Sequence, residues 1–388
     1  MPHTRHSFFL LHYSQKEQIF AIVQVHLSNS TTLQNTMQTN LETAKQALDK
    51  IIRKGRTHLY KPIQIAEILY YSRKKLTSIK TTELSTYRTA SKHWRDKVSL
   101  RLVGSKSTSS ARYQDNLFEA NAMPPRLLAV LDDINKQQDG VVENYIYHRL
   151  KGRLQDVIDA HTYLIQSSTQ SFQLQIFLDY FEQRAGLKRS VDKVYEIVVY
   201  ALFSTLVDEL EAKVTLSLNN PDPDLLADFS LFTDYVLGVS PEQTTITKPA
   251  RLYRAGVANA ADRGLDMWAN FGPVVQVKHL RLDPSRADDM IESIASDELV
   301  IVCQTAEADL IRSLLNQVGL PIKGIITQDN LIMWYGLCLT KYQERMGEKL
   351  LHHLSNEFLQ EFPILNEILS FLAERNYRPE QLTGYWQL

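Results

Sequence analysis

The spacing of apolar residues divides the chain into two parts of different character. Between residue 39 and about residue 185, apolar side chains recur every three or four positions, the spacing that gathers them on one face of an α-helix. The segments with this spacing are Leu41–Arg53, Ile63–Tyr71, Trp94–Val103, Leu127–Leu131 and Tyr145–Leu164. Strand-like alternation is scarce, so we predict a mainly helical N-terminal domain over residues 39–185.

Three short helical segments follow one another inside this domain. They cover Pro62–Arg73, Thr81–Tyr87 and Ala90–Leu102. Short helices joined by tight connections are typical of helix-turn-helix and winged-helix DNA-binding proteins, but ordinary helical bundles contain them too. The pattern therefore leaves both arrangements open.

From residue 186 to residue 388, predicted strands alternate with predicted helices. A long helix over Val191–Lys213 is followed by Val214–Leu218, a candidate extra strand of the sheet. The later elements are the strands Gly264–Trp268 and Pro273–Leu280, the helix Pro284–Ser296, the strand Leu299–Cys303, the helix Ala306–Val318, the strand Ile322–Thr327 and the helix Asp329–Cys338. This order predicts an α/β domain whose mixed sheet begins with an antiparallel hairpin and is flanked by helices on both faces.

Residues 1–38 show no sustained periodicity and become rich in Ser, Thr, Asn and Gln towards their end. We expect them to form a loosely attached extension, and Met37 is a candidate alternative start of translation. Lys16 and Glu17 interrupt the apolar stretch near the beginning, which argues against a signal peptide.

Composition excludes several classes of protein. No uncharged apolar run reaches the roughly 18 residues that a membrane span needs, so we expect a soluble cytoplasmic protein that does not bind membranes. Cys303 and Cys338 both lie in apolar stretches, as buried free thiols do, and support neither a disulfide framework nor a zinc site. The sequence has no G-x-x-x-x-G-K-[ST] loop, so ATP-driven translocation is not expected.

The net charge of −1 conceals an uneven distribution. Residues 51–126 hold 16 Lys and Arg against 5 Asp and Glu, an excess of +11, whereas the rest of the chain holds 27 against 39. A local excess of this size is typical of a surface that binds a polyanion, although a solvated helical face gives the same count. We therefore predict that the N-terminal domain binds nucleic acid.

Three polar residues gather on the predicted hairpin of the second domain. A turn at Ala269–Gly272 places Asp266 opposite Gln276, and directly opposed residues of an antiparallel pair lie about 5 Å apart at Cβ. Gln276 and Lys278 share one face of their strand because side chains alternate along it. The valines between and before them are expected to face the helix-covered core.

Hydrolysis of a phosphodiester needs a divalent metal that neutralises the phosphate and acidifies water, and a cation that spreads the developing charge. Mg²⁺ prefers carboxylates, carbonyl oxygens and retained waters, which Asp266, the side-chain oxygen of Gln276 and the backbone carbonyl of Val277 could supply. Lys278 would orient the attacking water. In the alternative, Asp266 caps the turn while Gln276 and Lys278 face solvent on an edge strand, but the Val-Val-x-Val pattern favours a central strand.

This arrangement resembles the PD-(D/E)XK nuclease fold, in which a strand acid and a Glu/Gln-x-Lys motif follow a helix that carries a further acid. Glu196 occupies the position of that helical acid. Gln276 replaces the commoner Glu and removes a negative charge, which makes Glu196 a metal ligand rather than an indirect partner.

Three longer segments, residues 94–104, 142–147 and 263–272, are similar to the HaeII-type restriction endonucleases, and the likeness extends over roughly residues 41–375. The resemblance implies a type II restriction endonuclease that uses Mg²⁺ and cleaves a short palindrome in double-stranded DNA as a homodimer. The segment 219–224 lacks the terminal aromatic residue of an amino-methyltransferase motif, and the chain has no Gly-rich cofactor loop, so we expect a separate methyltransferase to protect the host DNA.

The N-terminal domain carries the candidates for DNA contact. These candidates are Lys92, Arg95, Lys97, Lys106, Ser107, Ser109, Arg112 and Gln114. The first three lie on successive parts of a predicted helix surface, and the small hydroxyl residues suit close approach to phosphate. Arg112 and Gln114 can make bidentate contacts to guanine and adenine, although a flexible surface loop is the alternative.

Two other functions remain open at this point. A DNA-binding regulator with a non-catalytic α/β dimerisation domain would have no use for a converging Asp, Gln and Lys. A structure-specific repair nuclease would share the metal site but would not cut at a defined sequence.

Overall fold

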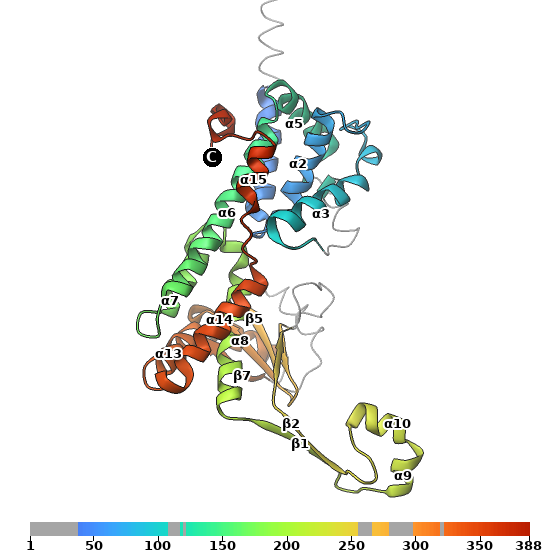
Figure 1. Ribbon diagram of the computed structural model, residues 1–388, viewed down its shortest axis with the longest axis vertical. Coiled ribbons are helices and arrows are strands. Elements are labelled where there is room, and N and C mark those ends of the chain that lie inside the picture. Colours follow the sequence, from blue (N-terminus) through green and yellow to red (C-terminus); the bar gives the residue numbers. More distant parts are fainter. Residues whose placement is uncertain (1–37, 108–116, 119–121, 255–265, 279–297, 319–321) are drawn as a thin grey trace, which may run out of the picture.

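The computed structural model describes residues 38–107, 117–118, 122–254, 266–278, 298–318 and 322–388 (Figure 1). Helices build the first part of the chain, as its apolar spacing predicts. They cover residues 38–54, α2 (Tyr60–Arg73), η1 (Leu84–Thr86), α3 (Ala90–Val103), α5 (Pro125–Gln137), α6 (Val141–Gln166) and α7 (Leu174–Gln183). Proline occupies the first position of α5, where its missing N–H costs nothing.

Of the three consecutive helices predicted, the first and third are confirmed as α2 and α3, but the second is wrong. Only one 3₁₀ turn, η1, forms there. The hydroxyl of Thr86 donates to the carbonyls of Lys80 and Glu83, at 3.1 and 2.8 Å. Such local side-chain bonds compete with the backbone bonds that would continue a helix.

The C-terminal segment packs against these N-terminal helices. It contains α15 (Glu367–Glu374), η6 (Pro379–Gln381) and η7 (Gly384–Trp386), and Figure 1 shows α15 beside the upper half of α6. Phe371, Tyr377 and Trp386 belong to the same buried apolar cluster as α2 and α6. The division into two domains at residue 185 stays a prediction. It did not include the packing of the C-terminal segment against the N-terminal helices.

A five-stranded mixed sheet forms the core of the second part and confirms the α/β fold class. Its strands, in spatial order, are β3 (Leu252–Arg254), β4 (Met267–Ala269), β5 (Val274–Lys278), β6 (Leu299–Cys303) and β7 (Ile322–Thr327). The neighbouring pairs β3–β4 and β4–β5 are antiparallel, and β5, β6 and β7 are parallel. The central place therefore belongs to β5, as its valine pattern predicted.

Helices cover both faces of this sheet. The covering helices are α8 (Val191–Glu209), α12 (Ala308–Val318), α13 (Gln328–Leu339) and α14 (Glu348–Glu361). Val275 and Val277 face the cluster built by α8, α13 and α14, whereas Val274 faces the cluster that holds Ile311 of α12. Alternation along β5 therefore puts Val275 and Val277 on one face and Val274 on the other, which it shares with the polar position Gln276 in the middle of the strand.

The predicted strand after α8 does form, but its expected place in the main sheet is wrong. β1 (Lys213–Ser217) pairs antiparallel with β2 (Thr245–Pro249) in a separate two-stranded ladder. Its side chains are exposed on both faces, so it could not lie inside a covered sheet. Residues 213–249, called the arm below, project away from the rest of the molecule (Figure 1).

Two further predictions can be compared with the structure. Cys303 and Cys338 are buried free thiols, as predicted. The predicted helix Pro284–Ser296, and residues 1–37 of the predicted extension, lie outside the described residues. In the part of the chain that the structure describes, no helix is long and apolar enough to cross a membrane.

Candidate active site

The β4–β5 hairpin brings Asp266 next to the central strand. Met267 pairs with Val275 and Trp268 with Val274, a register that continues to Asp266 opposite Gln276, as predicted. The turn needs Gly272, whose φ of 118° suits a residue without Cβ. Asp266 Oδ2 accepts a hydrogen bond from the backbone N–H of Val277 at 2.7 Å. One carboxylate oxygen is thus held on β5.

Gln276 does not face solvent, which excludes the edge-strand alternative for this residue. Its strand has β4 on one side and β6 on the other, and the residue is 1% exposed. Lys278 is the last residue of β5 and pairs with Cys303 of β6 through the backbone. The side chain of Lys278 lies outside the described part of the structure.

Glu196 supplies a second carboxylate from α8. It is 2% exposed, and both of its oxygens accept hydrogen bonds from Lys193 Nζ at 2.8 Å. Burial raises the pKa of Glu196 to about 7; the positive charge of Lys193 opposes this shift and the negative charge of Asp266 adds to it. The helix acid and the strand acid therefore lie close enough to repel each other, an arrangement that a bound cation would relieve.

Arg254 is a residue near this site that the sequence did not reveal. It ends β3, and its guanidinium donates to Glu357 at 2.7 Å and to Glu361 at 2.8 Å, both on α14. The same guanidinium lies 3.8 Å from Glu196. Arg254 therefore ties the edge of the sheet to α14 and brings positive charge to the buried end of α8. Its strand is only three residues long, too short to give a periodic signal.

The donors near the hairpin are those of a hard metal ion. The candidate donors are the carboxylates of Asp266 and Glu196, which influence each other, the side-chain oxygen of Gln276 on the strand beside Asp266, and the backbone carbonyl of Val277. In the residues that the structure describes, the hairpin included, no three His, Cys, Asp or Glu side chains form a group that could hold a metal ion, so the site would rely on two carboxylates with amide and carbonyl oxygens. Oxygen donors suit Mg²⁺ or Ca²⁺ rather than zinc, so the residues present fit the metal that the resemblance implies.

The candidates for DNA contact differ in their accessibility. On α3, Lys97 is exposed and Lys92 is half-buried, whereas Lys106 beyond the helix is exposed and Ser107 is half-buried. The predicted surface position of Arg95 is wrong. It is 3% exposed, because its guanidinium donates to Gln64 of α2 at 3.3 Å and to the neighbouring Asp96 at 2.8 Å. Ser109, Arg112 and Gln114 lie outside the described residues.

The positive excess counted over residues 51–126 is partly neutralised from outside that range. Arg73 pairs with Asp139 and Glu143, at 2.7 and 2.9 Å. Arg101 pairs with Glu367 and Glu374 of α15, at 3.1 and 2.6 Å. The count along the chain therefore overstated the positive charge that this surface offers to a polyanion.

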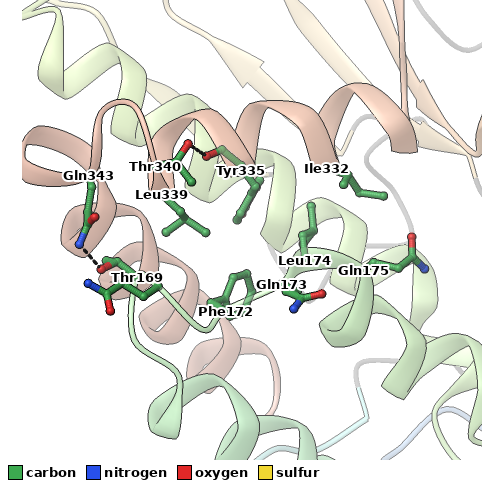
Figure 2. A pocket seen from close by; sticks show the side chains of 12 residues that line it. Thr169, Phe172, Gln173, Leu174, Gln175, Ile332, Tyr335, Leu339, Thr340 and Gln343 are labelled. Atoms are coloured by element: carbon green, nitrogen blue, oxygen red, sulfur yellow. Dashed lines mark hydrogen bonds between the residues drawn. The ribbon is translucent and has the colours of Figure 1, made fainter.

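A separate cavity of about 540 Å³ lies between the α6–α7 connection and α13 (Figure 2). Phe172, Leu174, Tyr335 and Leu339 give it apolar walls. Its polar lining consists of hydroxyl, amide and backbone groups without a charged side chain. It includes none of the candidate active-site residues and offers nothing to hold a metal or neutralise a phosphate.

Comparison with known proteins places these observations in context. The family profile described as HaeII restriction endonuclease matches residues 44–377. The chain is 47% identical over 339 residues to type II restriction enzyme NgoBI of Neisseria gonorrhoeae, covering 86% of this chain and 96% of the relative. It is 46% identical over 343 residues to type II restriction enzyme HaeII of Haemophilus aegyptius, covering 87% and 97%. No solved structure matches the chain.

Proposed function

The chain belongs to the HaeII restriction endonuclease family, and on that premise we propose that Asp266, Glu196, Gln276 and Val277 hold a magnesium ion at its active site. As a member of this family the protein is a type II site-specific deoxyribonuclease that acts on double-stranded DNA with a divalent metal. The observation that carries the site proposal is the convergence of two carboxylates beside the central strand, one of them buried.

Each residue has a separate task in this proposal. The backbone N–H of Val277 fixes one oxygen of Asp266 on β5, and this carboxylate would bind the metal. Lys193 holds Glu196 and offsets part of its negative charge. When bound, Mg²⁺ neutralises the scissile phosphate and acidifies water. Lys278, at the end of β5, orients the attacking water and stabilises charge on the phosphate.

The helical part of the protein binds the duplex in this proposal. Lys97 and Lys106 are exposed and contact phosphates, and Lys92 lies beside them on α3. Ser107 and Ser109 approach the backbone, while Arg112 and Gln114 read base edges. We further propose that the enzyme works as a homodimer on a palindrome in the cytoplasm, with a separate methyltransferase protecting the host.

Digestion of a plasmid of known sequence tests the proposed function. In Mg²⁺ we expect discrete fragments, whose ends give the recognised site after sequencing. Omission of metal, or its replacement by Ca²⁺, should prevent cutting while Ca²⁺ preserves binding. Diffuse cutting would favour a structure-specific nuclease, and binding without cutting would favour a regulator. Either outcome would contradict the proposal.

A further inference from the structure

The tip of the arm exposes an unusual amount of apolar surface. It consists of α9 (Pro223–Asp228), α10 (Ser230–Phe232) and η3 (Thr233–Leu237), between β1 and β2. The exposed large apolar residues here are Leu225, Phe229, Leu231, Phe232, Tyr235, Val236 and Leu237. Figure 1 shows the tip at the far end of the two-stranded ladder, away from the five-stranded sheet and the N-terminal helices.

This exposure does not reflect a lack of order within the tip. Leu226 and Val239 are buried, at 6% and 1% exposed, and hold the tip together. The side chain of Asp222 caps α9 by accepting from the N–H groups of Asp224 and Leu225, both at 3.0 Å. The tip is thus a folded unit that uses only part of its apolar surface for its own packing.

The aromatic residues alone show that the patch is large. Phe229, Phe232 and Tyr235 are 56%, 60% and 79% exposed. With side-chain areas of roughly 200 Å² each, they leave on the order of 400 Å² uncovered. That area is comparable to the largest apolar patch on a typical monomer, and four further apolar residues add to it. Patches of this kind mark surfaces that meet another molecule.

The charge of the arm argues against nucleic acid as that molecule. Residues 213–249 contain five acidic residues against two basic ones, a net charge of −3. Four of the acids, Asp222, Asp224, Asp228 and Asp234, belong to or flank the tip helices. Carboxylates at these positions would repel DNA phosphates. The patch therefore favours a protein partner.

We propose that this partner is a second copy of the same chain, and that two copies associate by packing each arm tip on the body of the other. The rest of the chain carries 41 basic and 39 acidic residues, a net charge of +2, so an exchange of arms joins opposite net charges. A two-fold axis makes the contact twice. The aromatics of two tips then contribute about 800 Å² towards the 1,200–2,000 Å² that stable interfaces bury.

This inference rests on the proposed function in one respect. Cutting both strands of a palindrome requires two active sites, and a reciprocal exchange of arms supplies two sites related by the same axis as the DNA. The arm begins where α8 ends, so the contact is joined through one helix to the carboxylate of Glu196. The arm thus connects the proposed dimer contact to the candidate active site.

The test is the oligomeric state of the full chain by sedimentation velocity. We expect the wild type to be a dimer at micromolar concentration, and a variant with Phe229→Ser, Phe232→Ser and Tyr235→Ser to be a folded monomer whose Tm, unlike that of the wild type, does not depend on protein concentration. Leu76→Ser combined with Leu369→Ser is the matched control, because these residues are exposed apolar side chains outside the arm. The control should remain a dimer.

A second variant removes the tip without disturbing the ladder. Ser217 and Thr245 are paired across β1 and β2, so a two-residue Asn-Gly turn can replace residues 218–244. This variant should also be a monomer. Its rate of double-strand cutting of plasmid DNA should fall more than its rate of nicking one strand.

Several outcomes would overturn the inference. A wild type that remains monomeric throughout the micromolar range would do so, as would a dimeric tip variant. A tip variant that stays dimeric but no longer binds duplex would assign the patch to DNA instead. The proposed function fails separately, if a dimeric wild type does not cleave DNA in Mg²⁺.

Discussion

Two buried glutamates, one in each part of the molecule, have different surroundings. Glu143, at the start of α6, is fully buried and accepts hydrogen bonds from Arg73, Asn135 and Tyr377. Glu196, on α8, is equally buried and is held by Lys193, but a second carboxylate, that of Asp266, lies near it. Both carboxylates have another carboxylate nearby, Glu67 for Glu143 and Asp266 for Glu196. Donors from three elements hold Glu143, whereas Glu196 is held by Lys193 of its own helix.

The difference separates a structural role from a functional one. Burial of a carboxylate is costly unless donors and a cation compensate it. Around Glu143 the compensation comes from α2, α5 and the C-terminal segment, so this residue joins three elements. Around Glu196 the cations are Lys193 and Arg254, and Arg254 is shared with Glu357 and Glu361, so carboxylates outnumber cations there. A divalent metal would bind this excess negative charge. Burial alone would not have distinguished the two residues.

The substitution Glu143→Gln should have the largest effect and should act on stability. It removes the buried one of the two carboxylates that pair with the Arg73 guanidinium, whose side chain is 8% exposed, and leaves only the exposed Asp139. Removing one partner of a buried ion pair costs about 3–5 kcal/mol. Chemical denaturation should show this loss, while the cleavage rate per folded molecule should hardly change at low temperature. A variant as stable as the wild type would mean that Glu143 is not a structural carboxylate.

Asp266→Ala and Lys278→Ala should have the next largest effect, and they should act on cleavage. Loss of one pre-organised polar group at a reacting phosphate typically costs about 100- to 1,000-fold in rate. Binding of duplex in Ca²⁺ should persist, because neither residue contacts bases in the proposal. Asp309→Ala is the control, since this carboxylate is almost fully exposed. Cutting by either site variant at the wild-type rate in Mg²⁺ would refute the assignment.

Glu196→Gln should separate activity from stability at a single position. Because the pKa of Glu196 is raised, ionisation of this carboxyl lowers the free energy of unfolding when no metal is bound. The loss of stability grows as pH rises from about 4.5 to about 7. In EDTA the variant should therefore match the wild type at pH 5 and exceed its melting temperature at pH 8. Cleavage in Mg²⁺ should be strongly reduced. A variant that is less stable than the wild type at pH 8 would show that Glu196, like Glu143, is a structural carboxylate.

The sequence predicted those elements whose signals are local. The strands β6 and β7 are short apolar runs, and the β4–β5 register follows from turn residues within the hairpin. The place of β1 was not predictable in the same way, because its Thr and Ser residues fit either a covered sheet edge or an exposed ladder. The place of β1 was decided by its pairing with β2, a strand distant in the sequence.

The environment of the site was less predictable than its residues. Asp266, Gln276 and Glu196 could be identified from motif spacing, but Arg254 reaches Glu361 across 107 positions of sequence. Arg95 shows the same limitation. Its place in a basic helix suggested an exposed side chain, whereas Gln64 of a different helix lies against it. Charge counts along a chain do not reveal which charges are compensated after folding.

The smallest effect we predict compares two positively charged residues of α3, exposed Lys97 and buried Arg95. If Lys97 contacts a phosphate, Lys97→Ala should weaken binding to cognate and scrambled duplexes alike and reduce the slope of log affinity against log salt by about one unit. Arg95→Ala should leave that slope unchanged and lower the melting temperature, because Arg95 bonds to Gln64 inside the domain. Fluorescence anisotropy in Ca²⁺ at several salt concentrations measures both slopes. Equal slopes for Lys97→Ala and the wild type would remove this face of α3 from the proposed DNA interface, whereas a reduced slope for Arg95→Ala would show that the buried guanidinium becomes exposed when DNA binds.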